Sequence, residues 1–257
     1  MYLPEKYKEK LIEVHEKGSD MIRSFGFVPE PLETALSVEE HRWFWKPKNV
    51  KFILVAESHV YTDGNEIRVK IDPNKLPIEV PKAIPLNFVR LVYCLGYGEP
   101  ELLGAPEKIE NNAGTKQYLN LFRRCVRLDE KPEDMTQLEW KVMTLNTLKE
   151  KGIWLLDASV HACYKGKGER LPSRLVKKII RVAWNGYVKP IIDDITIDRK
   201  SVWIIGKGLH DTLTGRYAWG SNWIYQPNAR FRDPEKYSEK EHRELELEKT
   251  VKHCCQI

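Results

Sequence analysis

The chain has 257 residues, 42% of them hydrophobic and 10% aromatic, a composition that can bury a sizeable core and argues against intrinsic disorder. Its formal net charge of +5 suits an anionic partner such as nucleic acid, since neutralised phosphates release counterions. The sequence has no apolar run long enough to cross a bilayer and no signal-peptide pattern in residues 1–10, so we expect a cytoplasmic protein with no membrane partner.

The first predicted element is a helix at residues 4–25, where charged and apolar positions alternate with helical periodicity up to Gly26. We assign residues 1–48 to an N-terminal helical extension. Four short apolar runs follow, and their branched side chains are typical of strands buried on both faces of a parallel sheet. The runs lie at residues 50–56, 152–158, 201–205 and 222–225.

Helical periodicity separates these runs, and Ser173 is the expected N-cap of the last helix among them. Residues 234–257 are nearly all charged and predict a solvated terminal helix. The alternation of strands and helices predicts one domain over residues 1–257, a three-layer α/β/α sandwich with a central, mainly parallel four-stranded sheet. The helices between the runs are expected at residues 87–95, 115–126, 135–149 and 173–184.

The five cysteines predict neither a disulfide framework nor a metal site. Their number is odd, and their spacing lacks the close pairs typical of zinc or iron–sulfur ligands. We therefore expect no metal and no cofactor. The cysteines are Cys94, Cys125, Cys163, Cys254 and Cys255.

Two carboxylates stand where strands end, which is where parallel sheets place their active sites. Glu57 directly follows the first run, and a buried carboxylate there can orient a water or offset a positive charge. Helix capping or a structural ion pair is an equal alternative. Asp157 follows four apolar residues and needs hydrogen-bond donors, which a ligand amine or the capping of the next loop would supply.

The other two strand ends and one basic region carry weaker signals. Lys207 lies between two glycines and is able to meet a phosphate, but the segment matches no Walker pattern. Residues 226–231 form a polar loop that is either functional or an ordinary surface turn. The basic region lines a groove or forms a solvated helix face, and it comprises Lys165, Lys167, Arg170, Arg174, Lys177, Lys178 and Arg181.

The order of these pieces over about residues 50–230 resembles the uracil-DNA glycosylase superfamily. In that fold a motif such as Gly-Glu-Ala-Pro-Gly follows the first strand, and a later apolar strand ends in Leu-Leu-Asn-Ala. Another strand ends near Trp-Gly-Lys, a His-Pro-Ser loop enters the minor groove, and one branch carries an Asn-Phe-Trp-type helix. The similar segments here are Ala56-Glu57-Ser58-His59-Val60, Leu155-Leu156-Asp157-Ala158, Trp203 to Lys207, Gln226-Pro227-Asn228 and residues 87–96.

The resemblance implies a monofunctional DNA glycosylase that flips a base out of duplex DNA and hydrolyses its N-glycosidic bond, leaving an abasic site. Glu57 would orient the attacking water and stabilise the developing cation. The loop histidine of the family is Gln226 here, so His59, His161 or Asn228 would stabilise the leaving base. The expected base contacts are Asp157, Val60, Tyr61, Phe88 and His161, and the expected DNA contacts are Lys207, Gln226, Asn228, Arg230, Lys165 and Lys167.

Asp157 shifts the expected base, because an ionised carboxylate only accepts hydrogen bonds and would repel the O4 of uracil. An exocyclic amine, as on cytosine, would suit it. Val60 stands where some relatives place a bulkier Tyr, which leaves room for a 5-substituent, and Tyr61 or Phe88 would stack on the base. These features favour a modified cytosine such as glucosylated 5-hydroxymethylcytosine, as in an antiviral defence enzyme, whereas a protonated Asp157 would readmit uracil or hypoxanthine.

Two further interpretations stay open. A catalytically inactive DNA-binding relative would explain the missing loop histidine. An unrelated α/β hydrolase of a small molecule would need no DNA, although the chain lacks a Gly-x-Ser-x-Gly elbow. For the glycosylase we expect a monomer whose partner is double-stranded DNA.

Overall fold

The computed structural model describes residues 2–77, 80–81, 83–114, 116–128, 130–164, 169–195, 197–217, 222–224 and 226, with the side chains of 214–217 left out. The expected terminal helix at 234–257 and the expected DNA contacts Lys165, Lys167, Asn228 and Arg230 lie outside these residues. The chain divides into two compact units. The first unit comprises Met1–Lys46, Glu57–Thr115 and Leu156–Thr196, and the second comprises Pro47–Ala56, Lys116–Leu155 and Ile197–Ile257.

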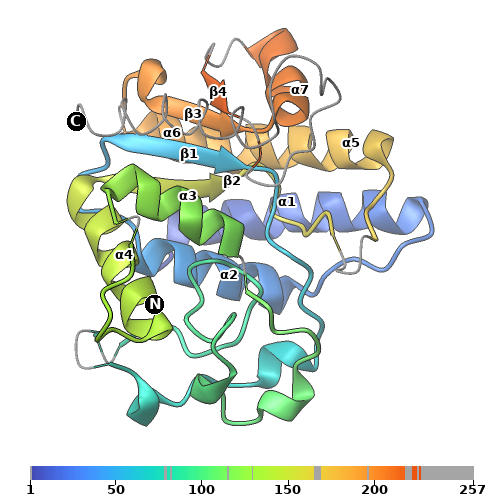
Figure 1. The fold of residues 1–257 in the computed structure, drawn as a ribbon. Helices are drawn as coiled ribbons and strands as arrows, with labels where there is room; N and C mark the ends of the chain where they lie inside the picture. Colours follow the sequence, from blue (N-terminus) through green and yellow to red (C-terminus); the bar gives the residue numbers. More distant parts are fainter. Residues whose placement is uncertain are drawn as a thin grey trace, which may run out of the picture. The chain divides into compact units, whose positions relative to one another are not determined.

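The second unit carries a four-stranded parallel sheet in the order β2-β1-β3-β4 (Figure 1). Residues of β1 pair with β3 in the register Ile53 to Val202, and β3 pairs in turn with β4. Every residue of β1 and β2 is buried, as expected for strands covered on both faces. The α/β class and the parallel four-stranded sheet are therefore confirmed. The strands are β1 (Phe52–Ala56), β2 (Ile153–Asp157), β3 (Val202–Ile205) and β4 (Trp223–Ile224).

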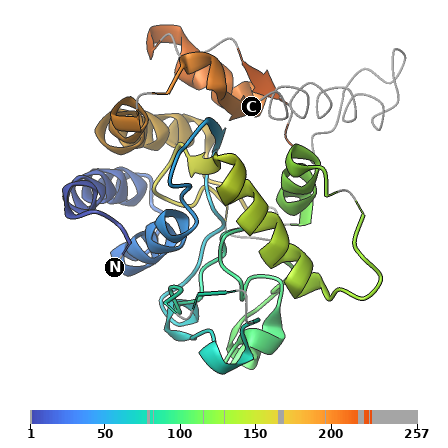
Figure 2. The ribbon, with the colours of Figure 1, turned by 90° about the vertical axis from the view of Figure 1, so that its left-hand side faces the viewer.

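Three helices belong to the second unit, namely α3 (Lys116–Val126), α4 (Gln137–Lys151) and α7 (Lys207–Tyr217). α3 and α4 pack side by side (Figure 2), and α7 packs on β3 and β4. A capping box starts α4, in which Thr136 and Glu139 satisfy each other's backbone N–H groups. Gly152 ends α4 in the left-handed conformation and leads directly into β2.

The first unit is mainly helical. α1 packs on α2, on α5 and on a π-helical turn at Trp184–Val188 that joins α5 to α6. The predicted helix that ends near Gly26 is thus confirmed as α1. These helices are α1 (Glu5–Ser24), α2 (Leu32–Phe44), α5 (Ser173–Ala183) and α6 (Lys189–Ile195). Among the described residues of both units, short 3-10 turns lie at Glu66–Arg68, Pro73–Lys75, Pro100–Leu102, Pro106–Lys108 and Arg199–Ser201.

Two local predictions are wrong. Residues 87–95 form bends and turns rather than a helix, because their backbone bonds to the segment after β1. The Phe88 N–H donates to the Val69 carbonyl, and the Arg90 N–H donates to the Thr62 hydroxyl. Ser173 is the first residue of α5 rather than its N-cap. Pro172 takes the cap position in an extended conformation, and its carbonyl accepts the first N–H bonds of the helix.

Candidate functional site

Glu57 lies directly after β1, and Arg170 holds its carboxylate. The Arg170 Nη2 atom lies 2.9 Å from Oε1 and 2.6 Å from Oε2 of Glu57. The Tyr164 side chain also interacts with this carboxylate and favours its ionised form. The Glu57 side chain is 10% exposed and that of Arg170 is 41% exposed, so the ion pair reaches from the interior to solvent.

The surroundings change the acid–base behaviour of this group. Burial raises the pKa of Glu57, and the Arg170 charge opposes that rise only in part. Burial and the Glu57 charge raise the pKa of Tyr164 to about 12, so its hydroxyl remains a hydrogen-bond donor near neutral pH. The arrangement holds one carboxylate in a fixed orientation, with the Arg170 guanidinium on both of its oxygens.

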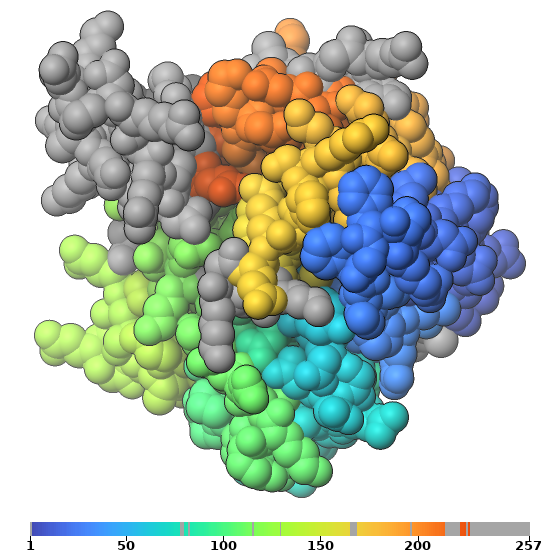
Figure 3. Space-filling view, turned by 90° about the vertical axis from the view of Figure 1, so that its right-hand side faces the viewer, coloured from blue at the N-terminus to red at the C-terminus, as the bar shows by residue number. Residues whose placement is uncertain are grey.

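A small pocket of about 100 Å³ lies beside this ion pair in the first unit. The residues that line it include Tyr61, Tyr164, Arg170, Phe27 and Val28. Figure 3 shows this face, where the blue N-terminal segment, the cyan segment after β1 and the yellow segment after β2 meet. The Tyr61 N–H donates to the Tyr164 carbonyl at 2.9 Å, which joins the two loops that follow β1 and β2.

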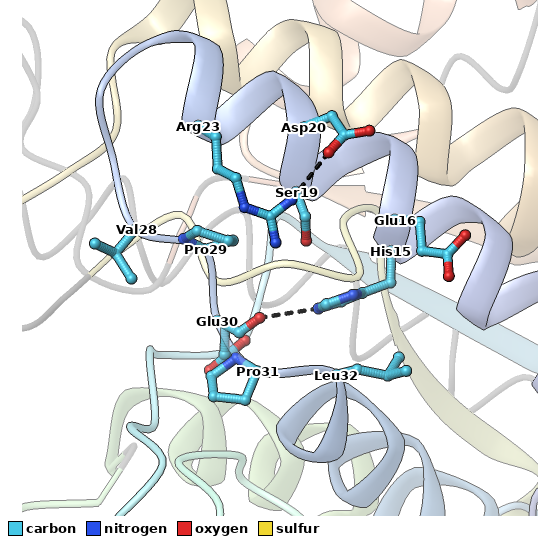
Figure 4. Close-up of a pocket in the computed structure, with 10 residues that line it drawn as sticks. All are labelled: His15, Glu16, Ser19, Asp20, Arg23, Val28, Pro29, Glu30, Pro31 and Leu32. Carbon is cyan, nitrogen blue, oxygen red and sulfur yellow. Dashed lines mark hydrogen bonds and ion pairs between the residues drawn. The ribbon is translucent and has the colours of Figure 1, made fainter.

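A wider groove of about 620 Å³ lies between α1 and residues 28–32 (Figure 4). His15, Ser19 and Arg23 point from α1 toward this segment. The His15 Nε2 lies 3.0 Å from the Glu30 carbonyl, and Arg23 pairs with Asp20 at 2.9 Å. Residues 28–30 line both the groove and the small pocket and so form the wall between them.

Asp157 does not face the small pocket but belongs to a buried ion-pair network. Its Oδ2 lies 2.6 Å from Nη2 of Arg42, whose Nη1 lies 2.6 Å from Oε1 of Glu39. The Tyr187 hydroxyl completes the network by donating to Glu39 at 2.8 Å. Burial disfavours the Asp157 charge, but the Arg42 guanidinium and His59 hold the pKa of that carboxyl below its ordinary value. Asp157 is therefore an ionised group paired inside the protein.

His59 extends the same network to Glu30. Its Nε2 lies 2.7 Å from Glu30 Oε2, and its Nδ1 lies 3.6 Å from Asp157 Oδ2, which is an ion-pair rather than a hydrogen-bond distance. Burial lowers the pKa of His59, but Glu30 and Asp157 outweigh burial and raise it to about 9. His59 is thus a buried cation between two carboxylates. Glu30 also accepts the Thr62 N–H at 2.8 Å.

These contacts change the roles expected for Asp157 and His59. Asp157 obtains its donor from Arg42, so its charge no longer argues for an amine on a bound base. His59 is buried with both ring nitrogens directed at protein carboxylates, so in this conformation it does not reach a substrate.

Two other residues expected at the base pack in the core instead. The His161 ring lies 4.3 Å from the His15 ring, centre to centre and tilted by 31°, and its Nε2 lies 3.0 Å from the His15 carbonyl oxygen. Burial lowers the pKa of His161 to about 3, so it is neutral. Phe88 is fully buried, edge-on to Tyr97. Of the residues expected at the base, Tyr61 therefore lines the small pocket, whereas His161 and Phe88 are buried in the core.

Of the second-unit residues that we expect to contact DNA, the structure describes Lys207 and Gln226. Lys207 starts α7, is exposed, and pairs with Asp211 at 2.6 Å. The Gln226 side chain lies against Gly206, which precedes α7.

The partners of Glu57 and Asp157 are the functional residues that sequence reasoning misses. Arg170 appears in the sequence only as one cation of a basic region, and it is 113 residues away from Glu57. Arg42 is 115 residues away from Asp157. One local signal existed, since Glu39 and Arg42 are three residues apart on a helix and can pair.

The comparisons with protein families, with curated proteins and with solved structures find no match to this chain. Among the described residues, no helix is both long and apolar enough to cross a membrane. The function is therefore inferred from the geometry of the site.

Proposed function

We propose that the chain is a DNA glycosylase in which Glu57 orients the water that hydrolyses an N-glycosidic bond. The observation that carries the proposal is the Glu57 carboxylate, which follows the central parallel strand β1 and is held by Arg170, a residue that lines a small pocket. N-glycoside hydrolysis builds positive charge on the sugar, and a fixed carboxylate stabilises that charge while it orients water. The resemblance in motif order supports the same assignment.

Arg170 links this chemistry to a DNA substrate. An arginine on a carboxylate stabilises its charge and makes it a weaker base, but this arginine is 41% exposed and able to exchange partners. A DNA phosphate that binds the guanidinium would release the Glu57 carboxylate for the water, since arginine pairs with phosphate as well as with carboxylate.

Asp157 no longer selects a base that carries an amine, because Arg42 already donates a hydrogen bond to its carboxylate. Modified cytosine, uracil and hypoxanthine are therefore equal substrates to test. The half-buried Val60 and Tyr61 are the residues near the small pocket that we expect to contact the base.

The test is an abasic-site assay with the full chain and duplexes that contain uracil, hypoxanthine, 5-hydroxymethylcytosine or its glucosylated form. We expect abasic product from at least one duplex and a rate at least about 100-fold lower for Glu57→Gln, the usual size of a general-base contribution. Glu9→Gln, an exposed carboxylate on α1, is the matched control and should keep the full rate. A Glu57→Gln variant with the full rate would remove Glu57 from the mechanism.

The pH profile gives an independent readout. Because the pKa of Glu57 is raised, the rate should fall with decreasing pH at a point above the ordinary Glu value of 4.5. Arg170→Gln should move this acid limb to still higher pH, since it removes the charge that favours the ionised carboxylate.

The second candidate is a DNA-binding protein without activity. The observation in its favour is that the two strand-end carboxylates, Glu57 and Asp157, both hold arginine in the structure. This candidate predicts duplex binding with no abasic product from any of the four substrates. A hydrolase of a small molecule would neither bind the duplex nor make abasic product.

A further inference from the structure

Exposed apolar side chains gather at one turn of the first unit. Among the described residues, the large hydrophobic side chains that are exposed are Tyr2 and three members of the turn after α1. We call Phe25, Phe27 and Val28 the apolar tip. Their exposed fractions are 36%, 37% and 68%, so water contacts a substantial apolar surface at this one place.

The backbone holds this turn in one conformation. The Phe27 N–H donates to the Ile22 carbonyl and the Gly26 N–H donates to the Arg23 carbonyl, which is the Schellman pattern of a helix C-terminus. Gly26 has a φ of +81°, which the pattern needs and glycine adopts without strain. The pattern commonly brings a hydrophobic contact between the residues at these two positions, here Ile22 and Phe27, but it does not account for the exposure of Val28.

The apolar tip borders the candidate active site. Phe27 and Val28 line the same pocket as Arg170, which holds the Glu57 carboxylate. Val28 also belongs to the wall between this pocket and the groove in Figure 4. An apolar group that protrudes beside a catalytic carboxylate is well placed to act on the substrate around the reacting nucleotide.

Positive charge adjoins the tip. The Lys178 Nζ lies 5.4 Å from the centre of the Phe25 ring, and Lys178 belongs to α5, which packs along α1. In the part of the chain that the structure describes, none of the exposed cations of α5 forms an ion pair. These cations are Arg174, Lys177, Lys178 and Arg181.

We propose that the apolar tip is a wedge that enters the base stack of duplex DNA and fills the gap left by the flipped base, while the cations of α5 hold the flanking phosphates. The inference rests on the proposed function for its substrate. A flat Phe ring and a compact Val fit between base steps, and apolar wedges of this kind unstack DNA in other proteins. Lysine and arginine beside the wedge complement the phosphates that flank such a gap.

The test uses the full chain carrying Glu57→Gln, which binds without cleaving, and a duplex with 2-aminopurine beside the target base. Binding should raise the 2-aminopurine fluorescence, because the probe brightens when it is unstacked. Phe27→Ala and Val28→Asp should abolish most of this rise and weaken duplex binding at least about fivefold, the lower range for removal of a base–aromatic stack.

Tyr2→Ala is the matched control. Tyr2 has the same 36% exposure as Phe25 but precedes α1, whereas the tip follows it, and a 20-residue helix separates them by about 30 Å. It should leave both the fluorescence rise and the affinity unchanged. Thermal unfolding of each variant, expected at the parent temperature, shows that the tip variants remain folded.

The outcomes separate the wedge from the proposed function. Duplex binding without a fluorescence rise, or tip variants that behave like the parent, would overturn the wedge even if the wild-type chain makes abasic product. Absence of abasic product alone would overturn the proposed function, and the fluorescence rise would still support the wedge. Loss of binding to anionic phospholipid vesicles in Phe27→Ala, with duplex binding intact, would overturn the wedge in favour of a lipid surface.

Discussion

At the scale of single residues, the main feature is a buried chain of alternating charges. Glu39, Arg42, Asp157, His59 and Glu30 follow one another at ion-pair distances, and all are buried. Removing any charge from the middle leaves its neighbours buried and unpaired, which costs far more than the pair contributes. The network therefore fixes Asp157 at the end of β2 and His59 in the segment that follows β1, and makes their geometry sensitive to substitution.

Arg42→Met tests this role. It leaves Asp157 and Glu39 without their shared cation, so the free energy of unfolding should fall by about 3–5 kcal/mol. Lys6→Met is the matched control, because Lys6 pairs with Asp194 at the exposed surface of the same unit and its removal should change little.

Urea unfolding followed by tryptophan fluorescence measures both variants. Equal decreases in Arg42→Met and Lys6→Met would contradict a structural role for the network. If Arg42→Met does not fold, the double variant Arg42→Met, Asp157→Asn should recover part of the stability, because it removes one of the two carboxylate charges that lose their partner.

At the scale of elements, the strands follow from local patterns, but one connection depends on backbone geometry. Gly152 ends α4 with a φ of +80°, and a Cβ there would lie 2.6 Å from the Asn49 carbonyl oxygen. This close approach lets the chain turn from α4 into β2 while the Gly152 carbonyl accepts the N–H groups that lead into β1. The strand that ends in Asp157 is thus placed by a glycine.

Gly152→Ala should lower the free energy of unfolding by at least about 1–2 kcal/mol, the cost of a left-handed conformation for a residue with a Cβ. Gly208→Ala is the control in the same unit. A Cβ at Gly208 meets no atom within 4 Å, and alanine is a better helix former, so this change should be neutral or stabilising by up to about 1 kcal/mol. Similar decreases in the two variants, measured by thermal unfolding, would show that backbone geometry at Gly152 is not decisive.

The same scale explains the wrong helix at residues 87–95. Their apolar spacing suits a helix, and nearly all of them are buried, but the segment gives its backbone bonds to residues 60–69. Burial in a core makes an irregular segment as apolar as a helix face, so periodicity alone does not separate the two.

At the scale of the whole molecule, the chain passes from the second unit to the first at the end of β1 and within β2. Both candidate carboxylates come directly after these crossings. The net charge of +5 is small, so attraction to DNA depends on where the cations lie, and α5 presents four exposed ones.

Salt dependence tests this distribution. Duplex affinity of the full chain should fall linearly in a log–log plot against salt, and Arg174→Ala with Lys178→Ala should reduce the slope by about 1 for each phosphate that is no longer neutralised. Lys6→Ala, a cation at the start of α1, should leave the slope unchanged. Fluorescence anisotropy across a salt series measures the duplex affinity at each salt concentration. Equal slopes for the parent chain, the α5 double variant and Lys6→Ala would exclude α5 from the DNA interface.

Side-chain patterns within a few residues are enough to predict the four strands, the α/β class and the positions of Glu57 and Asp157 at strand ends. The contacts of these two carboxylates depend on the tertiary structure instead. Arg170 and Arg42 lie more than a hundred residues from them in the chain, and no local pattern encodes a contact that folding alone creates. The same carboxylate at a buried strand end is a ligand-binding group or half of an ion pair, according to which distant cation packs against it.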